Sequence, residues 1–155
     1  MNTTSIEVDR PAPERAGAAV LHHIGFVLAC IEKDAAGAAR SLGARWDGKV
    51  FADPLQRVRV TFLITRDGSR IELVEPQGEK SPVWNFLING GGLHHICYEV
   101  DSLPEQLRVA RGEGAAVVRP PMPAVAFDGR RIAWVFTRYK LLIEYLERQP
   151  NSRCP

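Results

Sequence analysis

The tetrapeptide "LHHI" stands at residues 21–24 and again at residues 93–96. The chain has four histidines, and all of them belong to these two copies. The offset between the copies is 93 − 21 = 72, and at this offset two further segments superpose without a gap, namely "RVTFLITR" (59–66) on "RIAWVFTR" (131–138) and "IELVE" (71–75) on "IEYLE" (143–147). A repeat that holds over three segments indicates that the chain is a duplication of one structural unit.

Both copies predict the same order of elements. An apolar segment, "LHHIGFVLA" (21–29) or "LHHICYEV" (93–100), opens each copy and predicts a strand. A helix is expected at 32–42 in the first copy and at 104–111 in the second, and two or three further strands follow each helix. The sequence therefore predicts an α+β fold made of two tandem βαβββ modules, at residues 20–76 and 93–148.

The remaining segments are predicted to connect or flank the modules. Residues 77–92 are expected to form a linker helix, with Ser81 as its cap and Pro82 in its first turn. Residues 1–19 are expected to form a flexible arm, because their acids and prolines interrupt any apolar stretch that a signal peptide or an anchor would need. Residues 149–155 are expected to form a short C-terminal tail.

The composition is that of an ordinary globular protein of 155 residues. Hydrophobic residues make up 45% and charged residues 25%, and the formal net charge is +2. A charge this small gives no electrostatic reason to bind nucleic acid or an anionic membrane, and no apolar run reaches the roughly 20 residues of a spanning helix. The cysteines Cys30, Cys97 and Cys154 form neither a disulfide framework nor a C-x-x-C motif, so a cytoplasmic location is expected.

The paired histidines are expected to point in opposite directions. Side chains alternate between the two faces of a strand, which separates His22 from His23 and His94 from His95. On the face of His23 the next residue is Gly25, which leaves room above the sheet. We therefore assign His23 and His95 to a site, and expect His22 and His94 to face a helix or the interface between the modules.

Each module also places one glutamate in an apolar strand, Glu72 in the first and Glu144 in the second. A buried carboxylate is costly unless it is paired or binds a metal. Each glutamate follows the histidine of its module at the same interval (72 − 23 = 49 and 144 − 95 = 49), so a pseudo-twofold arrangement would bring two imidazoles and two carboxylates together. Such a set suits one divalent ion, and Co, Ni, Mn, Zn and Fe all accept it. The predicted ligands are His23, Glu72, His95 and Glu144.

The motifs of the repeat resemble those of the vicinal oxygen chelate superfamily, which has the glyoxalase fold, and most closely those of its methylmalonyl-CoA epimerase branch. The resemblance rests on four segments, "LHHIGFVL" (21–28), "RIELVEP" (70–76), "SPVWNFLINGGGLHHICYEVDSL" (81–103) and "LLIEYLE" (141–147). It implies a cupped eight-stranded mixed sheet around a divalent metal held by the same four residues, and a homodimer. It also implies that the metal chelates two vicinal oxygens of an acyl thioester while a carboxylate moves the α-proton.

The sequence departs from that branch in two places. Some epimerases carry a base glutamate at the position of Val60, which here lies in an apolar segment. The stretch before the last strand is replaced by the shorter "TRYK" (137–140), and both changes favour a cavity that is more apolar or aromatic. The expected cavity residues are Val60, Phe62, Trp134 and Cys97, and the candidates for the base are Glu99, Glu72 and Glu144.

Three functions remain open on this fold. The first is a metal-dependent epimerase or isomerase that removes a proton next to a carbonyl, with an acyl-CoA such as methylmalonyl-CoA as the small-molecule substrate. The second is a protein that binds a drug or natural product or serves in its biosynthesis, which an apolar cavity favours and the ligand set opposes. The third is an iron dioxygenase, for which the resemblance implies two histidines and one glutamate, or a glyoxalase, which shares the whole metal shell.

Overall fold

The computed structural model describes residues 19–149. The predicted arm at 1–19 and the predicted tail at 149–155 lie outside the described residues, apart from one residue at each boundary. Within the described part, no helix has both the length and the apolar character that crossing a membrane requires.

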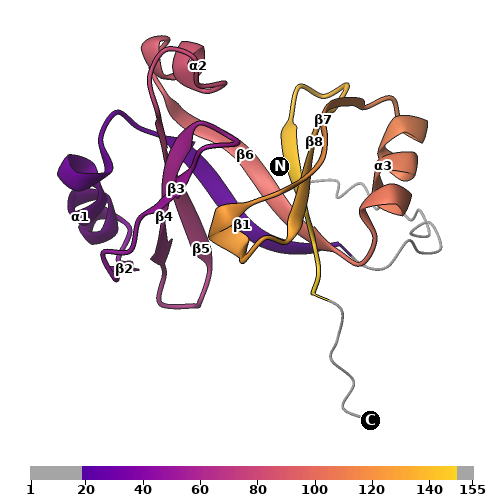
Figure 1. Ribbon diagram of the computed structural model, residues 1–155. Coiled ribbons are helices and arrows are strands. Elements are labelled where there is room, and N and C mark those ends of the chain that lie inside the picture. The colour runs from indigo at the N-terminus through magenta and orange to yellow at the C-terminus, as the bar shows by residue number, and fades with distance from the viewer. Residues whose placement is uncertain (1–18, 150–155) are drawn as a thin grey trace, which may run out of the picture.

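The chain runs through the same order of elements twice (Figure 1). The first module contains β1 (Val20–Val27), α1 (Ile31–Ser41), β2 (Arg45–Trp46), β3 (Phe51–Asp53), β4 (Val58–Ile64) and β5 (Arg70–Pro76). After the short helix α2 (Trp84–Ile88), the second module contains β6 (Gly92–Val100), α3 (Leu103–Gly112), β7 (Ala116–Pro123), the 3-10 turn η1 (Val125–Phe127), β8 (Arg131–Phe136) and β9 (Leu142–Glu147). The predicted α+β class is confirmed.

All strands belong to one mixed sheet in the order β2-β4-β5-β1-β6-β9-β8-β7, with β3 also pairing with β4. The two opening strands, β1 and β6, pair antiparallel at the centre and thereby join the modules. Each of them also pairs in parallel with the last strand of its own module, β1 with β5 and β6 with β9. In Figure 1 the helices α1 and α3 lie at the two outer ends of this sheet.

The sheet has nine strands where eight were predicted, because the edge strand of the first module is broken. β2 pairs with the end of β4, at Leu63 and Ile64, and β3 pairs with its beginning, at residues 58–60. Gly48, with a φ of 77°, lies between the two pieces and turns the chain out of the ladder. The eight strand positions of the predicted fold are therefore retained.

Each long helix packs on the outer face of its own module. The buried stripe of α1 consists of Ile31, Ala35 and Ala39, spaced four residues apart, and it covers Leu63 and Leu73. The helix α3 covers β8 and β9 in the same way. Alternation along the strands then directs the intervening side chains to the inner face of the sheet, where the candidate site lies.

The linker contains a shorter helix than the sequence predicted. Within the predicted range 77–92, α2 begins at Trp84, and Val83 precedes it without a side-chain cap. Ser81 is not the cap: its carbonyl accepts a hydrogen bond from the amide of Trp84, and its buried hydroxyl has no partner in the described structure. The residues that the prediction assigned to the first helical turn instead form a separate turn that begins at Ser81.

Candidate metal centre

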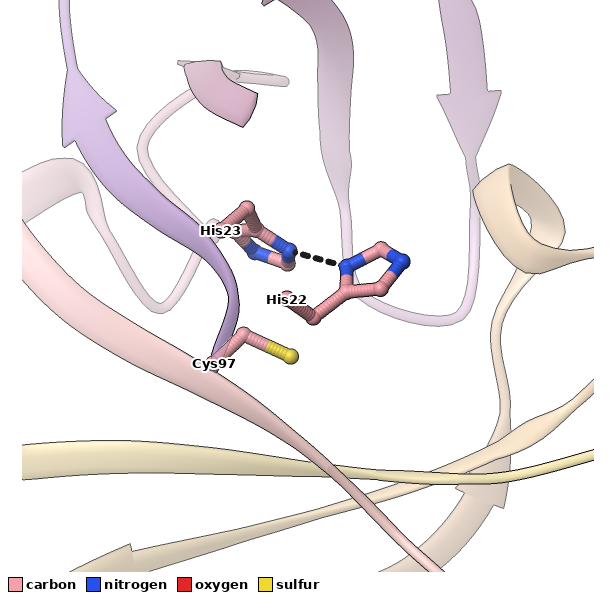
Figure 2. Close-up of side chains that lie close together, drawn as sticks. All are labelled: His22, His23 and Cys97. Carbon is pink, nitrogen blue, oxygen red and sulfur yellow. Dashed lines mark hydrogen bonds between the residues drawn. The ribbon is translucent and has the colours of Figure 1, made fainter. Parts of the chain in front are cut away.

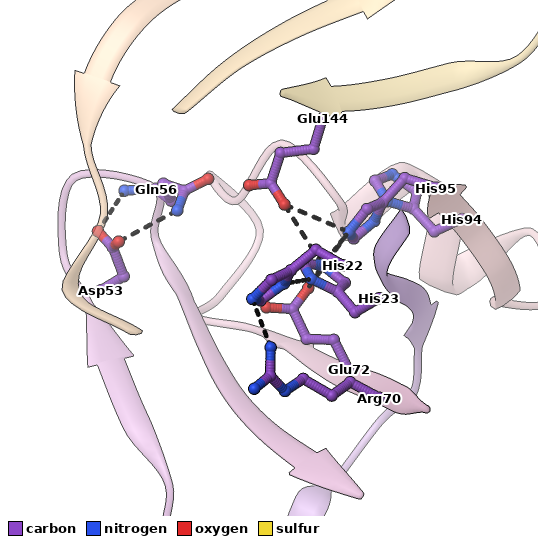
Figure 3. Close-up of polar contacts among 9 residues, drawn as sticks. All are labelled: His22, His23, Asp53, Gln56, Arg70, Glu72, His94, His95 and Glu144. Atoms are coloured by element: carbon purple, nitrogen blue, oxygen red, sulfur yellow. Dashed lines mark hydrogen bonds and ion pairs between the residues drawn. The ribbon is translucent and has the colours of Figure 1, made fainter. Parts of the chain in front are cut away.

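Two histidines and two glutamates from four strands converge on the inner face of the sheet (Figure 3). The Nε2 atoms of His23 on β1 and His95 on β6 are 3.1 Å apart. Oε2 of Glu72 on β5 lies 3.4 Å from Nε2 of His23 and 3.3 Å from that of His95. Oε2 of Glu144 on β9 lies 3.3 and 3.8 Å from the same two nitrogens. All four side chains are buried, and the four predicted ligands therefore lie together.

The strand register explains this convergence. Each of the four residues stands beside a small residue on one of the two central strands. The pairs in register are Gly25 with Glu72, Gly25 with His95, Cys97 with His23, and Cys97 with Glu144. Gly25 and Cys97 are themselves related by the offset of the repeat (97 − 25 = 72), so the repeat in the sequence becomes a pseudo-twofold relation between β1 and β6. Adjacent strands lie about 4.8 Å apart, which lets the four side chains meet.

Gly25 is required by the packing of His95. A Cβ atom at this position would lie 1.9 Å from Cε1 of His95, 2.4 Å from its Nδ1 and 2.5 Å from its Nε2. The room that the sequence predicted above Gly25 is thus filled by the imidazole of the other module. Any larger residue would displace His95 or the strand.

The other histidine of each pair does not obey strict alternation. The pairing of β1 with β6 shifts register twice, and the residues left unpaired are His22 and His94. Such bulges re-aim a side chain. Nδ1 of His22 lies 2.9 Å from Nδ1 of His23, which Figure 2 shows beside Cys97, and Nδ1 of His94 lies 3.0 Å from Nδ1 of His95. The expectation that His22 and His94 point away from the ligands is wrong, although His94 also packs on α2.

Opposite charges hold the centre of the cluster together. Burial disfavours the imidazolium of His23, but the carboxylates of Glu72 and Glu144 outweigh burial and raise the pKa of His23 to about 10. Burial also disfavours the carboxylate of Glu72, but His23 and His95 outweigh it and lower the pKa of Glu72. The carboxylates of the cluster therefore stabilise a positive charge placed between them, which here is carried by the imidazolium of His23.

His22 and His94 are neutral in this arrangement. Burial, together with His23 and Arg70, lowers the pKa of His22 to about 4, and burial with His95 lowers the pKa of His94 to about 4. Nη1 of Arg70 lies 2.8 Å from Nε2 of His22 and can only donate to it.

The donor set fits a divalent ion. Ligand atoms bonded to one ion at about 2.1 Å lie about 3.0–3.4 Å apart, and the separations within this cluster run from 3.1 to 3.8 Å. Oε2 of Glu144 is buried and makes no hydrogen bond within the described residues, so its lone pairs are free to bind an ion. His23, His95 and Glu144 form a set whose ligand atoms all lie within 4.8 Å of one another, and Glu72 adds a second carboxylate.

A cavity of about 250 Å³ opens beside these groups. Three of the four predicted ligands line it, and so do the predicted cavity residues Val60 and Trp134. Trp134 packs on His95 with ring centroids 4.7 Å apart. Further apolar lining comes from Val58, Val74, Pro82, Val83, Val118, Ala126, Phe127 and Leu142. The predicted apolar and aromatic character of the cavity is present.

Comparison with known proteins identifies the family. Residues 22–134 match the model of the Glyoxalase/Bleomycin resistance protein/Dioxygenase superfamily. The chain belongs to this superfamily. A curated relative, the Ethylmalonyl-CoA/methylmalonyl-CoA epimerase of Cereibacter sphaeroides, is 33% identical over 117 residues, which cover 74% of this chain and 86% of the relative.

Solved structures agree with this assignment to the glyoxalase superfamily. The hypothetical protein BH1468 from Bacillus halodurans C-125 superposes with a TM-score of 0.75 at 28% identity, covering 88% of this chain and 99% of that one. The methylmalonyl-CoA epimerase of Mycobacterium tuberculosis superposes with a TM-score of 0.74 at 23% identity, covering 89% and 95% of the two chains. At the latter identity the likeness concerns the fold alone.

Three residues that the sequence assigned to this glyoxalase-fold site do not line its cavity. Glu99 lies four residues beyond His95 on β6, a distance of about 13 Å along a strand. It forms an ion pair of 2.8 Å with Arg130. Cys97 is fully buried, and its burial is the main cause that raises the pKa of its thiol well above the usual range. Phe62 packs edge-on against the imidazole of His23, with ring centroids 5.6 Å apart.

Sequence reasoning missed several polar residues of the cavity, chiefly Asp53, Gln56 and Arg119. Asp53 is buried and accepts hydrogen bonds from the amides of Leu55, Gln56 and Val125 and from the side chain of Gln56, which lies beside it in Figure 3. The bond to Val125 ties the first module to η1 of the second. Asp53 ends the edge strand β3, Gln56 lies in the following turn, and Arg119 lies at a register shift of β7. Such positions follow no repeat and no periodicity, so the sequence offered no signal for them.

Proposed function

We propose that the protein is a metal-dependent epimerase or isomerase that acts on an acyl-CoA with an acidic α-proton. The observation that carries this proposal is the convergence of His23, Glu72, His95 and Glu144 on one point. The name of the relative from Cereibacter sphaeroides, which states an epimerase of ethylmalonyl-CoA and methylmalonyl-CoA, supports the substrate class. A divalent ion held by the four residues would stabilise the negative charge that develops on the carbonyl oxygen when the α-proton leaves.

The cavity walls would bind the acyl group and keep water away from it. Val60, Val74 and Leu142 present aliphatic surface, and Trp134 adds a flat aromatic wall next to His95. Exclusion of water strengthens the electrostatic interactions inside a site and protects a carbanion from unwanted protonation. The apolar residue Val60 cannot itself move a proton, so a carboxylate elsewhere in the cavity must do so.

We assign the proton transfer to Glu72. Asp53 is occupied by four hydrogen bonds, and Glu99 is paired outside the cavity, which leaves Glu72 and Glu144. His23, His95 and Glu144 form a compact set without Glu72, whose side chain is also the more exposed of the two, at 8% against 3%. Glu72 would have to release the ion to take the α-proton. Addition of a solvent proton to the opposite face of the planar carbanion would then invert the centre, and Glu72 would return its proton to solvent.

The proposal is tested by combining elemental analysis with isotope exchange. The purified protein is analysed for bound metals and then incubated in D2O with methylmalonyl-CoA or ethylmalonyl-CoA. We expect one divalent ion per chain, and deuterium at the α-carbon by mass spectrometry at a rate well above a protein-free control. Chelation should abolish the exchange and added metal should restore it. Metal-loaded protein that exchanges neither substrate above the control would refute the proposal.

A second candidate function is iron-dependent dioxygenation. His23, His95 and Glu144 form a set of two histidines and one carboxylate, which is typical of non-haem iron oxygenases. Uptake of oxygen by the ferrous protein with a catechol, in the absence of deuterium exchange into acyl-CoA, would favour this function. The additional carboxylate of Glu72 on both imidazoles is the feature that makes the epimerase the better assignment.

A further inference from the structure

Arg119 lines the same cavity as the candidate metal ligands. Within residues 19–149 its guanidinium donates to a single group, the thioether sulfur of Met122, with Nη1 3.8 Å from Sδ. A thioether is a weak acceptor and carries no charge. Other arginines of the described chain, such as Arg130 and Arg131, each form an ion pair with a glutamate. Arg119 is therefore a cation at the cavity without a counter-charge in the described structure.

The edge strand β7 is shaped around this residue. The pairing of β7 with β8 shifts register on both sides of Arg119, once after Val117 and once before Met122. Pro120 and Pro121 occupy the second shift, and prolines cannot donate to the ladder. Irregularities of this kind re-aim side chains and are frequent beside active sites. The backbone thus directs Arg119 to the cavity wall.

Arg119 also stands in the same row across the sheet as a candidate ligand. Its partner on β8 is Trp134, and the partner of Trp134 on β9 is Glu144. All three residues line the cavity. Two strand spacings separate the backbones of Arg119 and Glu144 by about 10 Å, and the long arginine side chain can cover much of that distance. A group bound near Glu144 would therefore lie within its reach.

The other charged groups that line the cavity already have partners. Asp53 accepts four hydrogen bonds, and Glu72 and Glu144 face the imidazoles of the cluster. A cation that a ligand buries without a partner is costly, whereas a guanidinium that meets a carboxylate gains two parallel hydrogen bonds. The unmatched charge of Arg119 therefore favours a ligand that brings its own oxyanion.

We infer that Arg119 binds an oxyanion of the substrate, and that this oxyanion is the second carboxylate of a dicarboxylic acyl thioester. The inference rests on the proposed function, because it adds a specificity residue to that site. The phosphates of coenzyme A are another source of oxyanions, but the pantetheine arm holds them many bonds away from the thioester. The place of Arg119 in the same row as Glu144, two strands away, favours the acyl carboxylate.

The test measures binding rather than turnover. Isothermal titration of the metal-loaded protein gives dissociation constants for malonyl-CoA, for propionyl-CoA, which lacks the second carboxylate, and for malonyl-pantetheine, which lacks the phosphates. The variant Arg119→Met removes the charge but keeps a long unbranched side chain. Arg119→Lys keeps the charge but loses the planar guanidinium that can donate two parallel hydrogen bonds. The matched control is Arg111→Met, because Arg111 is exposed at the end of α3, away from the cavity.

We expect Arg119→Met to raise the dissociation constants of malonyl-CoA and malonyl-pantetheine about tenfold or more. The dissociation constant of propionyl-CoA should change less than about twofold, and the affinity for the metal should not change. Arg119→Lys should recover part of the loss, and Arg111→Met should change nothing. Weaker binding of malonyl-CoA and propionyl-CoA alike, with malonyl-pantetheine unaffected, would transfer the contact to a phosphate and overturn the carboxylate assignment. Unchanged affinity for all three ligands would overturn the inference entirely. If the wild-type protein holds metal but binds none of them, the proposed function itself fails.

Discussion

The two halves of the site follow one plan, but the residues at their centres differ. The equivalent positions of the repeat are Gly25 and Cys97, and each stands between a glutamate and a histidine. At Gly25 the imidazole of His95 occupies the place of a Cβ atom. At Cys97 a buried thiol lies next to His23 instead. The strand register around the two positions is therefore symmetric, whereas the packing of their side chains is not.

As a result, one ligand histidine faces the cavity and the other does not. His95 lines the cavity, whereas His23 is covered by the rings of Phe62 and Phe127. The duplicated strands thus determine which four groups meet, and the unequal residues around them determine which imidazole a substrate can approach. Substitutions that act on one half alone can measure how much each half contributes.

The largest effect is expected from Gly25→Ala, because the added methyl group would overlap the ring of His95. Overpacking in a filled core costs about 1–3 kcal/mol, and the displaced imidazole can no longer share an ion with His23. We expect metal affinity to fall at least about 100-fold, more than loss of a supporting contact costs. Titration of the protein with a divalent ion, monitored by calorimetry, measures this affinity.

A matched control exists on α1. A Cβ atom at Gly37 would meet only the end of Arg40, at 3.9 Å. Gly37→Ala should therefore leave metal affinity unchanged and raise the free energy of unfolding by about 0.5–1 kcal/mol, since alanine is favoured in helix interiors. Full metal binding by Gly25→Ala would show that His95 is not a ligand in the position described.

The two carboxylates should respond differently to the same isosteric change. Glu72→Gln should lower the rate of α-deuterium exchange about 100-fold or more, the usual contribution of a general base, while the ion still binds. Glu144→Gln should instead weaken metal binding about tenfold or more and lose activity in proportion to the metal lost, because Glu144 belongs to the compact ligand set. Parallel losses of metal and rate in both variants would contradict the assignment of the base to Glu72.

A smaller and also unequal effect is expected at the histidines of the bulges. Nδ1 of His94 can accept the Nδ1–H of His95, which leaves Nε2 of His95 free for an ion. His94→Leu should therefore weaken metal binding roughly tenfold, at the lower end of what loss of a supporting contact costs. Nε2 of His22 is already engaged by the guanidinium of Arg70, so His22 is less free to support that ligand and His22→Leu should cost less. Equal losses in the two variants would remove this asymmetry.

The sequence could predict the four ligand residues because their positions depend on quantities that a sequence contains. The common offset of the two copies and the equal intervals from histidine to glutamate specify equivalent places in two strands, and alternation selects the face. The same reasoning placed Glu99 on the face of His95 but could not show that the sheet carries it too far along the strand. It also failed at His22 and His94, because a bulge inserts one unpaired residue and reverses the face.

The rest of the site depends on contacts that no repeat encodes. Asp53 reaches η1 from the end of an interrupted edge strand, and Arg119 reaches the cavity because β7 loses its register around two prolines. Both residues lie where strands end or distort, and there the local backbone rather than periodicity determines the direction of a side chain. Edges and loops of the sheet therefore have to be seen in three dimensions.

The smallest effect is expected from Cys97→Ala, the counterpart of Gly25→Ala in the other half. The thiol is fully buried and its raised pKa keeps it neutral, so it packs beside Glu144 without contributing charge. Removing the sulfur should lower the free energy of unfolding by about 1 kcal/mol, as for the loss of a small buried group, and change metal affinity less than about threefold, well below the cost of losing a supporting contact. Thermal unfolding and metal titration provide the two measurements. Since Sγ of Cys97 lies within 4.8 Å of ligand atoms of His22 and His23, a loss as large as that of Gly25→Ala would mean that the ion is held on the far side of His23 instead.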